Sequence, residues 1–137
     1  MRALVDIGLH GGGNPVQLRE IAEREDISEK YLEHLMSLLK GAGFVRSVRG
    51  AKGGYFLARE AAEINLHEVV NVLEGSLAPA ECVTDAKLCD RSGSCVTRDV
   101  WGEIQDVING VLESITLEEL CQRQKEKDRS TKGMYYI

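Results

Sequence analysis

The sequence has 137 residues, 43% of them hydrophobic, which is enough for one domain with a substantial core and too few for two large ones. No apolar run approaches the roughly 18 residues of a membrane span, and the N-terminus lacks an apolar segment with a cleavage site, so we expect a cytoplasmic chain without a membrane partner. The net charge of −5 argues against nucleic acid, yet residues 28–59 hold six Lys or Arg against two Glu, a local +4 that leaves −9 elsewhere.

The N-terminal part of the chain predicts three helices, the last two forming a helix-turn-helix. Apolar residues recur at helical spacing over residues 4–9 and 17–25, and the glycines and proline of residues 10–15 separate these helices. A third helix with one apolar face follows and is ended by Gly41. The turn Asp26-Ile27-Ser28 lies between the second and third helices, and its serine is placed to cap the third.

A β-hairpin is predicted next, followed by a fourth helix. The β-prone runs at residues 44–49 and 55–57 flank Gly50-Ala51-Lys52-Gly53-Gly54, an arrangement typical of a wing after a recognition helix. Asn65-Leu66-His67-Glu68 resembles a capping box and opens a helix that closes at Gly75.

A cysteine-bearing loop, residues 79–93, leads into the longest predicted helix. Over residues 96–115 apolar residues recur at intervals of three and four, a stripe wide enough to pack on more than its own small domain. The stripe predicts a partner helix, with dimerisation contacts from Trp101, Ile104, Ile108, Val111 and Leu112.

The C-terminal residues predict a short helix and a charged stretch. Thr116-Leu117-Glu118-Glu119 is a second capping-box signature, for a helix that we expect to end near Cys121. Residues 122–132 are charged and expected to be exposed, and the apolar tail, residues 134–137, is expected to dock on the protein. Cys121 shares helical spacing with two leucines, which favours the role of a small buried hydrophobic residue.

The other three cysteines, Cys82, Cys89 and Cys95, lie in the loop before the long helix. Their spacing, Cys-x6-Cys-x5-Cys, is wider than the Cys-x2-4-Cys of structural zinc sites and suits a loop that wraps around an iron–sulfur cluster. Zinc, a metal-free thiol switch or cysteines without a special role remain alternatives. Cys95 precedes a helix whose N-terminal dipole favours the thiolate, so it is a site that is easy to ligate or oxidise.

Three stretches carry a resemblance to a known family: Ile27-Ser28-Glu29-Lys30-Tyr31-Leu32-Glu33, Val48-Arg49-Gly50-Ala51-Lys52-Gly53-Gly54-Tyr55, and the three-cysteine loop running into Trp101. Over nearly its whole length the chain resembles the bacterial winged-helix regulators of the IscR, NsrR and CymR type. The resemblance implies a homodimer with crossed C-terminal helices that binds a double-stranded DNA operator. Cluster-binding members hold a 2Fe-2S or 4Fe-4S cluster in this loop. CymR lacks the loop cysteines and is controlled by a cysteine-biosynthesis enzyme.

The chain departs from this family pattern at two places. Members usually begin about a dozen residues earlier, with a Lys-Gly-x-Tyr element in the first helix. The fourth cluster ligand of IscR is a histidine at the place of Arg98. The resemblance therefore leaves the fourth ligand open, with four candidates: Asp6, His67, Asp90 and Asp99.

Two groups of residues are predicted to contact DNA. The first turns of the third helix carry major-groove candidates: Ser28, Lys30, Tyr31 and Glu33. Capping alone would also explain the serine, and the glutamate either accepts a hydrogen bond from a cytosine or points to solvent. At the hairpin tip, the minor-groove candidates are Arg49, Lys52 and Gly53.

The sequence thus predicts a mainly α fold with one small β-hairpin. Residues 1–75 form the expected winged helix-turn-helix domain, residues 76–95 the cluster loop, and residues 96–137 the dimerisation helix and tail. The expected function is transcription regulation controlled by an iron–sulfur cluster. The alternative is a cluster-free repressor of cysteine or sulfur metabolism, controlled by a partner protein or by thiol oxidation. No catalytic triad, Cys-x-x-Cys motif or cofactor fingerprint is present, so we do not expect an enzyme.

Overall fold

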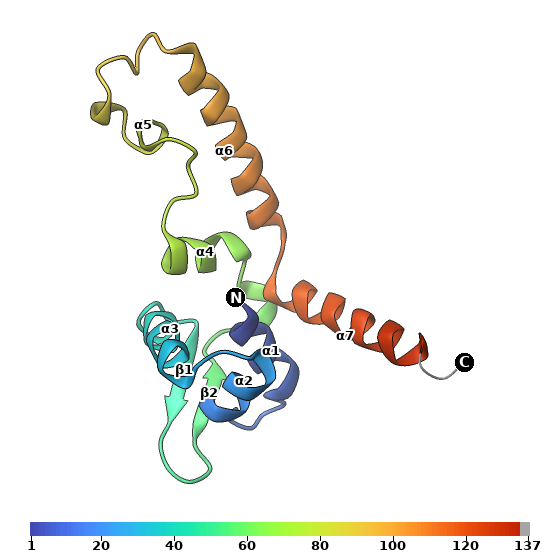
Figure 1. Ribbon diagram of the computed structural model, residues 1–137. Coiled ribbons are helices and arrows are strands. Elements are labelled where there is room, and N and C mark those ends of the chain that lie inside the picture. The colour runs from blue at the N-terminus through green and yellow to red at the C-terminus, as the bar shows by residue number, and fades with distance from the viewer. Residues whose placement is uncertain (135–137) are drawn as a thin grey trace.

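The computed structural model describes residues 1–134. These residues are mainly helical and contain one two-stranded antiparallel sheet (Figure 1). The longer elements, in chain order, are α1 (Arg2–His10), α2 (Leu18–Glu25), α3 (Glu29–Gly41), β1 (Val45–Val48), β2 (Gly54–Leu57), α4 (Leu66–Glu74), α6 (Val96–Ser114) and α7 (Leu117–Met134). Three short helical segments complete the order: η1 (Ala61–Glu63), α5 (Glu81–Thr84) and η2 (Ala86–Leu88). None of the helices in residues 1–134 is long and apolar enough to cross a membrane. The fold confirms the predicted winged helix-turn-helix with a long C-terminal helix.

The N-terminal core lies where α1, α2, α3 and the hairpin meet. Its central side chains are almost fully enclosed, with Leu4, Ile21, Leu32 and Met36 all 0% exposed. The turn between α2 and α3 is tight because Asp26 takes a left-handed conformation, with φ of 51°. The apolar faces predicted from helical spacing therefore meet in one core, and they fix α3 against α2.

A backbone joint connects this N-terminal unit to the two C-terminal helices. The N–H of Leu117 donates to the carbonyl of Ile64 at 2.8 Å, and the N–H of Leu66 donates to the carbonyl of Ile115 at 3.0 Å. Ile64 and Leu117 are 0% and 1% exposed. The start of α4 and the α6–α7 corner are thereby held together, and we call residues 64–66 and 115–117 the joint.

Helix α7 differs from the prediction. The expected end near Cys121 is wrong, because α7 continues to Met134. Residues 122–132 are exposed, as expected, and helical, with side-chain pairs one turn apart along the solvated surface. These pairs are Arg123 with Glu119, Gln122 with Glu126, and Gln124 with Asp128. The predicted docking of the tail falls on residues 135–137, outside the described residues, and on Met134, which is 78% exposed.

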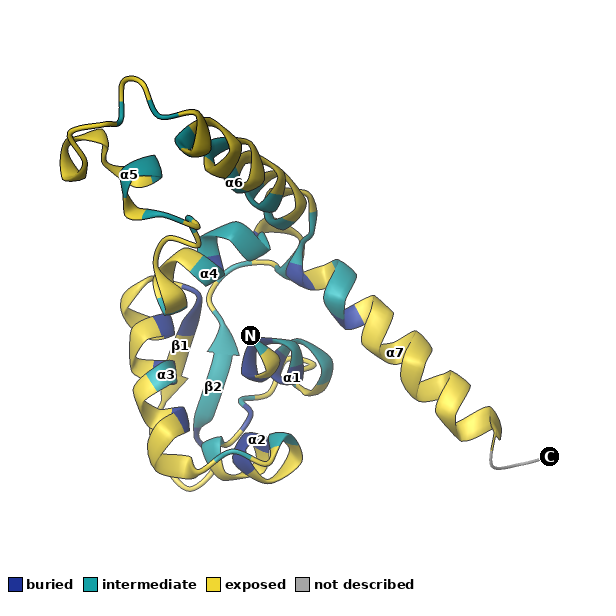
Figure 2. Ribbon diagram, turned by 45° about the horizontal axis from the view of Figure 1, so that its top comes forward, coloured by how far each residue is buried: buried dark blue, intermediate teal, exposed yellow. Residues whose placement is uncertain are grey.

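The helices α6 and α7 extend away from the N-terminal unit in two directions (Figures 1 and 2). The tip of the hairpin and the cysteine-bearing segment around α5 lie at opposite ends of the molecule. The cysteine-bearing segment is connected to the N-terminal unit on one side by residues 75–80, which follow α4, and on the other side by α6 and the joint.

Candidate DNA interface and cysteine loop

Helix α3 presents its first turn to solvent. The hydroxyl of Ser28 accepts a hydrogen bond from the backbone N–H of Tyr31 at 3.2 Å, so the predicted cap is confirmed. Leu32 and Met36 anchor the opposite side in the core. The four candidate DNA-reading residues all lie on the open side and are exposed: Ser28, Lys30, Tyr31 and Glu33.

The hairpin ends in an exposed, positively charged tip. The strands pair from Val45 with Leu57 to Val48 with Gly54, and both Arg49 and Lys52 are exposed. Gly53 is buried instead, and a Cβ atom there would lie 2.2 Å from the carbonyl oxygen of Val48. Gly53 is therefore required by the turn itself, and a contact with DNA would have to come from its backbone.

A single-residue β-bridge at Val16 supports the hairpin, and the sequence analysis missed it. Val16 and Tyr55 exchange backbone hydrogen bonds of 3.0 and 2.8 Å. The next side chain, Gln17, donates from Nε2 to the carbonyl of Ala51 at 3.4 Å, which links the start of α2 to the hairpin tip. A single apolar residue between Pro15 and a helix is too short a signal to predict a strand.

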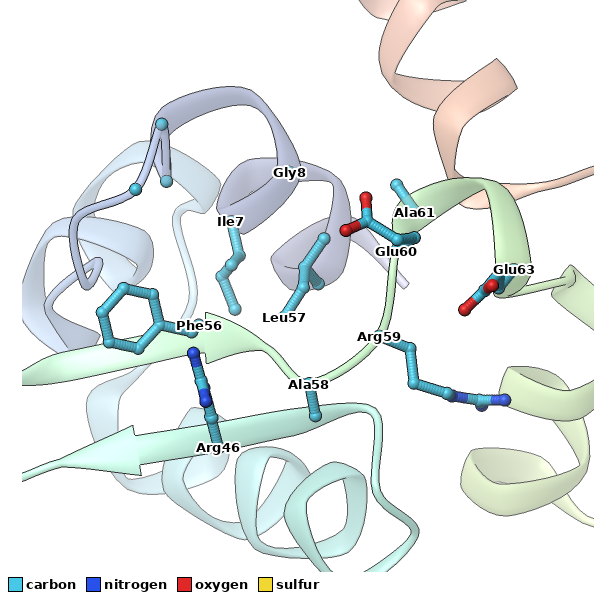
Figure 3. Close-up of a pocket in the computed structure, with 13 residues that line it drawn as sticks. Ile7, Gly8, Arg46, Phe56, Leu57, Ala58, Arg59, Glu60, Ala61 and Glu63 are labelled. Atoms are coloured by element: carbon cyan, nitrogen blue, oxygen red, sulfur yellow. The ribbon is translucent and has the colours of Figure 1, made fainter.

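Two arginines at the base of the hairpin stack on aromatic rings. The guanidinium of Arg46 lies 5.2 Å from the ring centre of Phe56, and that of Arg59 lies 4.6 Å from Phe44. Arg59 also donates to the carboxylate of Glu68 on α4 at 3.2 Å. Both arginines border an open cleft of about 650 Å³ beside α1 (Figure 3). Their engagement with the protein leaves the hairpin tip as the more available positive surface.

The three loop cysteines lie at three successive helical elements. Cys82 lies in α5, Cys89 directly follows η2, and Cys95 is the N-cap of α6. All three are free thiols, with Cys89 exposed and the other two half-buried. In the part of the chain that the structure describes, no three His, Cys, Asp or Glu side chains lie close enough together to hold a metal ion. Ligation by all three thiols would therefore require the loop to close.

The thiol of Cys95 lies in an environment that favours its anion. The Sγ atom lies 3.0 Å from the hydroxyl of Thr97, and this contact is the largest cause of a lowered pKa for Cys95. The backbone N–H of Arg98 lowers the pKa further, whereas Asp99 opposes the shift. This agrees with the expectation from the helix N-terminus.

Arg98 also fastens the loop to α6. Its Nε donates to the backbone carbonyl of Cys82 at 3.0 Å across a sequence separation of 16 residues. Arg98 thus makes a structural contact with the backbone of a loop cysteine.

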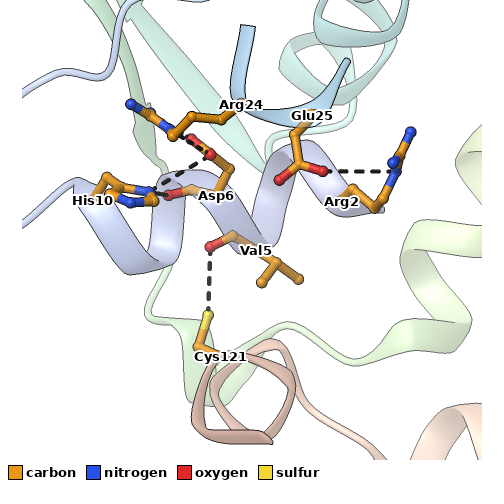
Figure 4. A network of polar contacts seen from close by, with 7 residues as sticks. All are labelled: Arg2, Val5, Asp6, His10, Arg24, Glu25 and Cys121. Atoms are coloured by element: carbon orange, nitrogen blue, oxygen red, sulfur yellow. Dashed lines mark hydrogen bonds and ion pairs between the residues drawn. The ribbon is translucent and has the colours of Figure 1, made fainter. Parts of the chain in front are cut away.

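Asp6, one candidate for the fourth ligand, belongs to a polar network in the N-terminal unit (Figure 4). The carboxylate is 2% exposed and accepts two hydrogen bonds of 2.7 Å from Arg24. His10 lies 3.6 Å from the same carboxylate. Both oxygens of Asp6 are therefore engaged within its own protomer.

The remaining candidates lie nearer the long helix. His67 on α4 lies 3.7 Å from the carboxylate of Glu113 on α6 and also contacts Asn71. Asp90 and Asp99 are exposed beside the cysteines. Within one protomer, the structure brings none of these side chains together with the three thiols.

The apolar stripe of helix α6 is exposed to solvent. Several large apolar side chains are exposed: Val96, Val100, Trp101, Ile104, Val107 and Val111. Of the predicted dimerisation residues, Trp101, Ile104 and Val111 are exposed, and Ile108 and Leu112 are half-buried. An exposed apolar surface of this kind is typical of a helix that packs against another chain.

The helix-turn-helix, the supported wing and the exposed positive tip together define a winged-helix DNA-binding protein. The chain matches the Rrf2 family model, described as iron-dependent transcriptional regulator, over residues 1–123. It belongs to the Rrf2 family and is a transcription regulator, not an enzyme.

Relatives and solved structures support this assignment. The chain is 43% identical to protein rrf2 of Nitratidesulfovibrio vulgaris, covering 88% of this chain and 81% of the relative. It is 40% identical to the regulator IscR of Photorhabdus laumondii, covering 92% and 76%. Among solved structures, T. potens IscR has a TM-score of 0.75 at 41% identity, covering 92% and 82%. CymR of B. subtilis, titled the global cysteine regulator, has a TM-score of 0.72 at 37% identity, covering 88% of each chain. The predicted resemblance to the IscR and CymR type is thus confirmed.

Proposed function

We propose that this chain is a homodimeric regulator whose operator binding is controlled by an iron–sulfur cluster held by Cys82, Cys89 and Cys95. The observation that carries the proposal is the order of these cysteines. Three free thiols share one loop, and the last of them, whose pKa is lowered, is the N-cap of α6. A change at the loop would therefore act directly on the longest helix of the fold.

The donor set fits such a cluster. Thiolates are the usual ligands of iron–sulfur clusters, and three of them would leave one coordination position for another group. The loop segments α5 and η2 are short and mostly exposed, so closing the loop would disturb little buried structure. When bound, a 2Fe-2S or 4Fe-4S cluster supplies an inorganic centre that can be oxidised, nitrosylated or lost.

On the DNA side, α3 would enter the major groove and the wing tip would approach the minor groove. Ser28, Lys30 and Tyr31 are exposed on one end of α3, where the N-terminal residues of a recognition helix contact bases and phosphates. Arg49 and Lys52 supply positive charge at the wing tip, as minor-groove contacts require. In a dimer, two such units would read half-sites about 34 Å apart, one turn of DNA. The protein would act in the cytoplasm, where the bacterial chromosome lies.

Coupling between the two ends would use the joint. A rotation of α6 moves residues 115–117, which are hydrogen bonded to residues 64–66 at the start of α4. Arg59 and Glu68 connect α4 to the end of the hairpin. Loop closure that is more favourable in one arrangement of α6 would therefore shift the population of the DNA-binding form.

The decisive experiment measures iron and sulfide per chain after oxygen-free purification, together with operator affinity. We expect coloured protein with bound iron, and loss of most of the iron in Cys82→Ser, Cys89→Ser and Cys95→Ser. Cys121→Ser is the matched control, because this cysteine is buried against α1 and should leave the iron content unchanged. Colourless, iron-free wild-type protein after anaerobic reconstitution would refute the proposal.

A second function is favoured by one observation: CymR structures are among the neighbours, and one of them, from Staphylococcus aureus, is titled an oxidized form. In this alternative the chain carries no cluster, and thiol oxidation or a partner protein controls DNA binding. Iron-free protein whose operator affinity changes on peroxide treatment, and not in Cys95→Ser, would support it.

A further inference from the structure

The contact between Arg98 and Cys82 has a consequence for the cysteine loop. Helix α5 has only four residues, so most of its backbone carbonyls have no partner within the helix. The carbonyl of Cys82 receives its hydrogen bond from Arg98 Nε, at 3.0 Å and in a partly buried position. Within residues 1–134, the other side-chain hydrogen bond of α5 joins Thr84 to Ser76, at 3.1 Å. The hydrogen bond from Arg98 thus attaches α5 to α6.

Arg98 also lies close in the sequence to a second loop cysteine, Cys95. Cys95 is the N-cap of α6, and Arg98 lies in the first turn that follows. Arg98 therefore hydrogen bonds to the backbone of one proposed ligand residue, Cys82, and lies in the first turn of the helix that begins at another, Cys95.

The charge of Arg98 is not neutralised by an ion pair. Within residues 1–134, Arg98 makes no salt bridge closer than 4.0 Å, although the cleft that it lines with Val83 also contains Asp99, Glu103 and Asp106. A guanidinium keeps its positive charge at physiological pH and cannot bind a metal ion. Arg98 is therefore available to the loop as a hydrogen-bond donor and not as a metal ligand.

We propose that Arg98 is a positioning residue for the cysteine loop: its side chain holds the backbone of Cys82 at the first turn of α6, the helix that Cys95 caps. At the position where IscR-type members have a cluster ligand, this chain has a residue that positions the loop. This inference rests on the proposed function for its purpose, since a loop segment already attached to α6 lowers the cost of closing the loop around a cluster. The contact itself can be tested without any metal.

The first test labels the iron-free, full-length protein with iodoacetamide under reducing, oxygen-free conditions and follows each cysteine by mass spectrometry. Cys89 is exposed and serves as the internal reference for half-buried Cys82. Arg98→Met keeps the length of the side chain and removes both donor and charge. We expect the Cys82-to-Cys89 rate ratio to rise about fivefold, because a charge-assisted hydrogen bond that attaches α5 to α6 is lost. Arg98→Lys, which can still donate and keeps the charge, should stay near wild type.

Arg91→Met is the matched control, since Arg91 is an exposed arginine in the same loop and should leave the ratio unchanged. An unchanged ratio in Arg98→Met, or an equal rise in Arg91→Met, would overturn the inference. The second test is iron content after anaerobic reconstitution with ferrous iron and sulfide, which should fall in Arg98→Met and not in Arg98→Lys. If wild-type protein itself binds no iron, the cluster proposal fails, while the labelling result still decides the role of Arg98.

Discussion

At the scale of single residues, two cysteines of the same chain have opposite chemistry. Cys95 lies at the start of a helix beside the hydroxyl of Thr97, and these donors lower the pKa of its thiol. Cys121 is buried between α7 and α1, and burial raises the pKa of its thiol. Position relative to hydrogen-bond donors and to water, and not the residue type, decides which cysteine is available as a thiolate.

The first prediction concerns the pH dependence of Cys95. In iron-free, reduced protein, its alkylation rate should reach half of its maximum at a lower pH than that of Cys121, because hydrogen bonds stabilise the Cys95 thiolate and burial disfavours the Cys121 thiolate. Thr97→Val removes the largest of these contributions, so the midpoint should move to higher pH. Asp99→Asn removes an opposing charge, so the midpoint should move to lower pH. A Thr97→Val midpoint equal to wild type would show that the hydroxyl does not set this pKa.

At the scale of elements, the packing of α7 on α1 depends on a close contact. A Cβ atom on Gly8 of α1 would lie 2.6 Å from the Sγ atom of Cys121 on α7. This thiol also lies 3.8 Å from the carbonyl of Val5 (Figure 4). The absence of a side chain at residue 8 is therefore what allows the two helices to approach.

The second prediction follows from this contact. In a helix, Gly→Ala usually stabilises by up to about 1 kcal/mol, but at Gly8 the added methyl group should cost about 1–3 kcal/mol through overpacking. Gly8→Ala should thus unfold at lower urea concentration, measured at a fixed protein concentration. In Gly8→Ala/Cys121→Ala the loss should be smaller than the sum of the single losses.

Gly41→Ala is the control for the second prediction, because a Cβ atom there would meet nothing within 4 Å. It should be neutral or slightly stabilising. Strictly additive losses in the double variant would contradict the proposed clash.

At the scale of the whole molecule, the long helix α6 connects the cysteine loop with the joint beside the N-terminal unit. Its N-terminus holds Cys95, and its C-terminus runs into the joint with α4 and α7. Along its length an apolar stripe lies open to solvent in a single protomer, with Val96 75% and Val107 67% exposed. A second copy packed on this stripe would bury it and would bring two DNA-binding units into one particle.

The third prediction tests this arrangement. Val107 is exposed in the protomer, so Val107→Glu should leave helix content and thermal stability of the monomer nearly unchanged. A charge in an apolar interface is costly, and we expect light scattering to show a shift from dimer to monomer. Operator affinity should fall by at least about tenfold, since the two half-sites would no longer be bound by one linked particle. Glu103→Gln, a change at an exposed polar position of α6, is the control; dimeric Val107→Glu with normal affinity would place the interface elsewhere.

Much of the N-terminal unit could be predicted from the sequence because its signals are local. The spacing of Leu32 and Met36 determines which face of α3 is buried, and Ser28 caps the helix from the adjacent position in the chain. The glycines around Lys52 favour a turn between two β-prone runs. These preferences agree with one another, so the local pattern and the fold coincide.

The sequence by itself thus determined the winged-helix architecture, the amphipathic long helix and the set of free loop thiols, since periodicity, capping and residue chemistry act over a few positions. Only the tertiary structure decided the contacts between residues far apart in the chain. These are the pairing of Val16 with Tyr55, the joint between residues 64–66 and 115–117, and the bond from Arg98 to Cys82. No sequence spacing encodes such contacts, because they depend on how complete elements pack in space. The length of α7 was missed for a related reason: its exposed half is stabilised by polar pairs one turn apart and has no apolar stripe to reveal it.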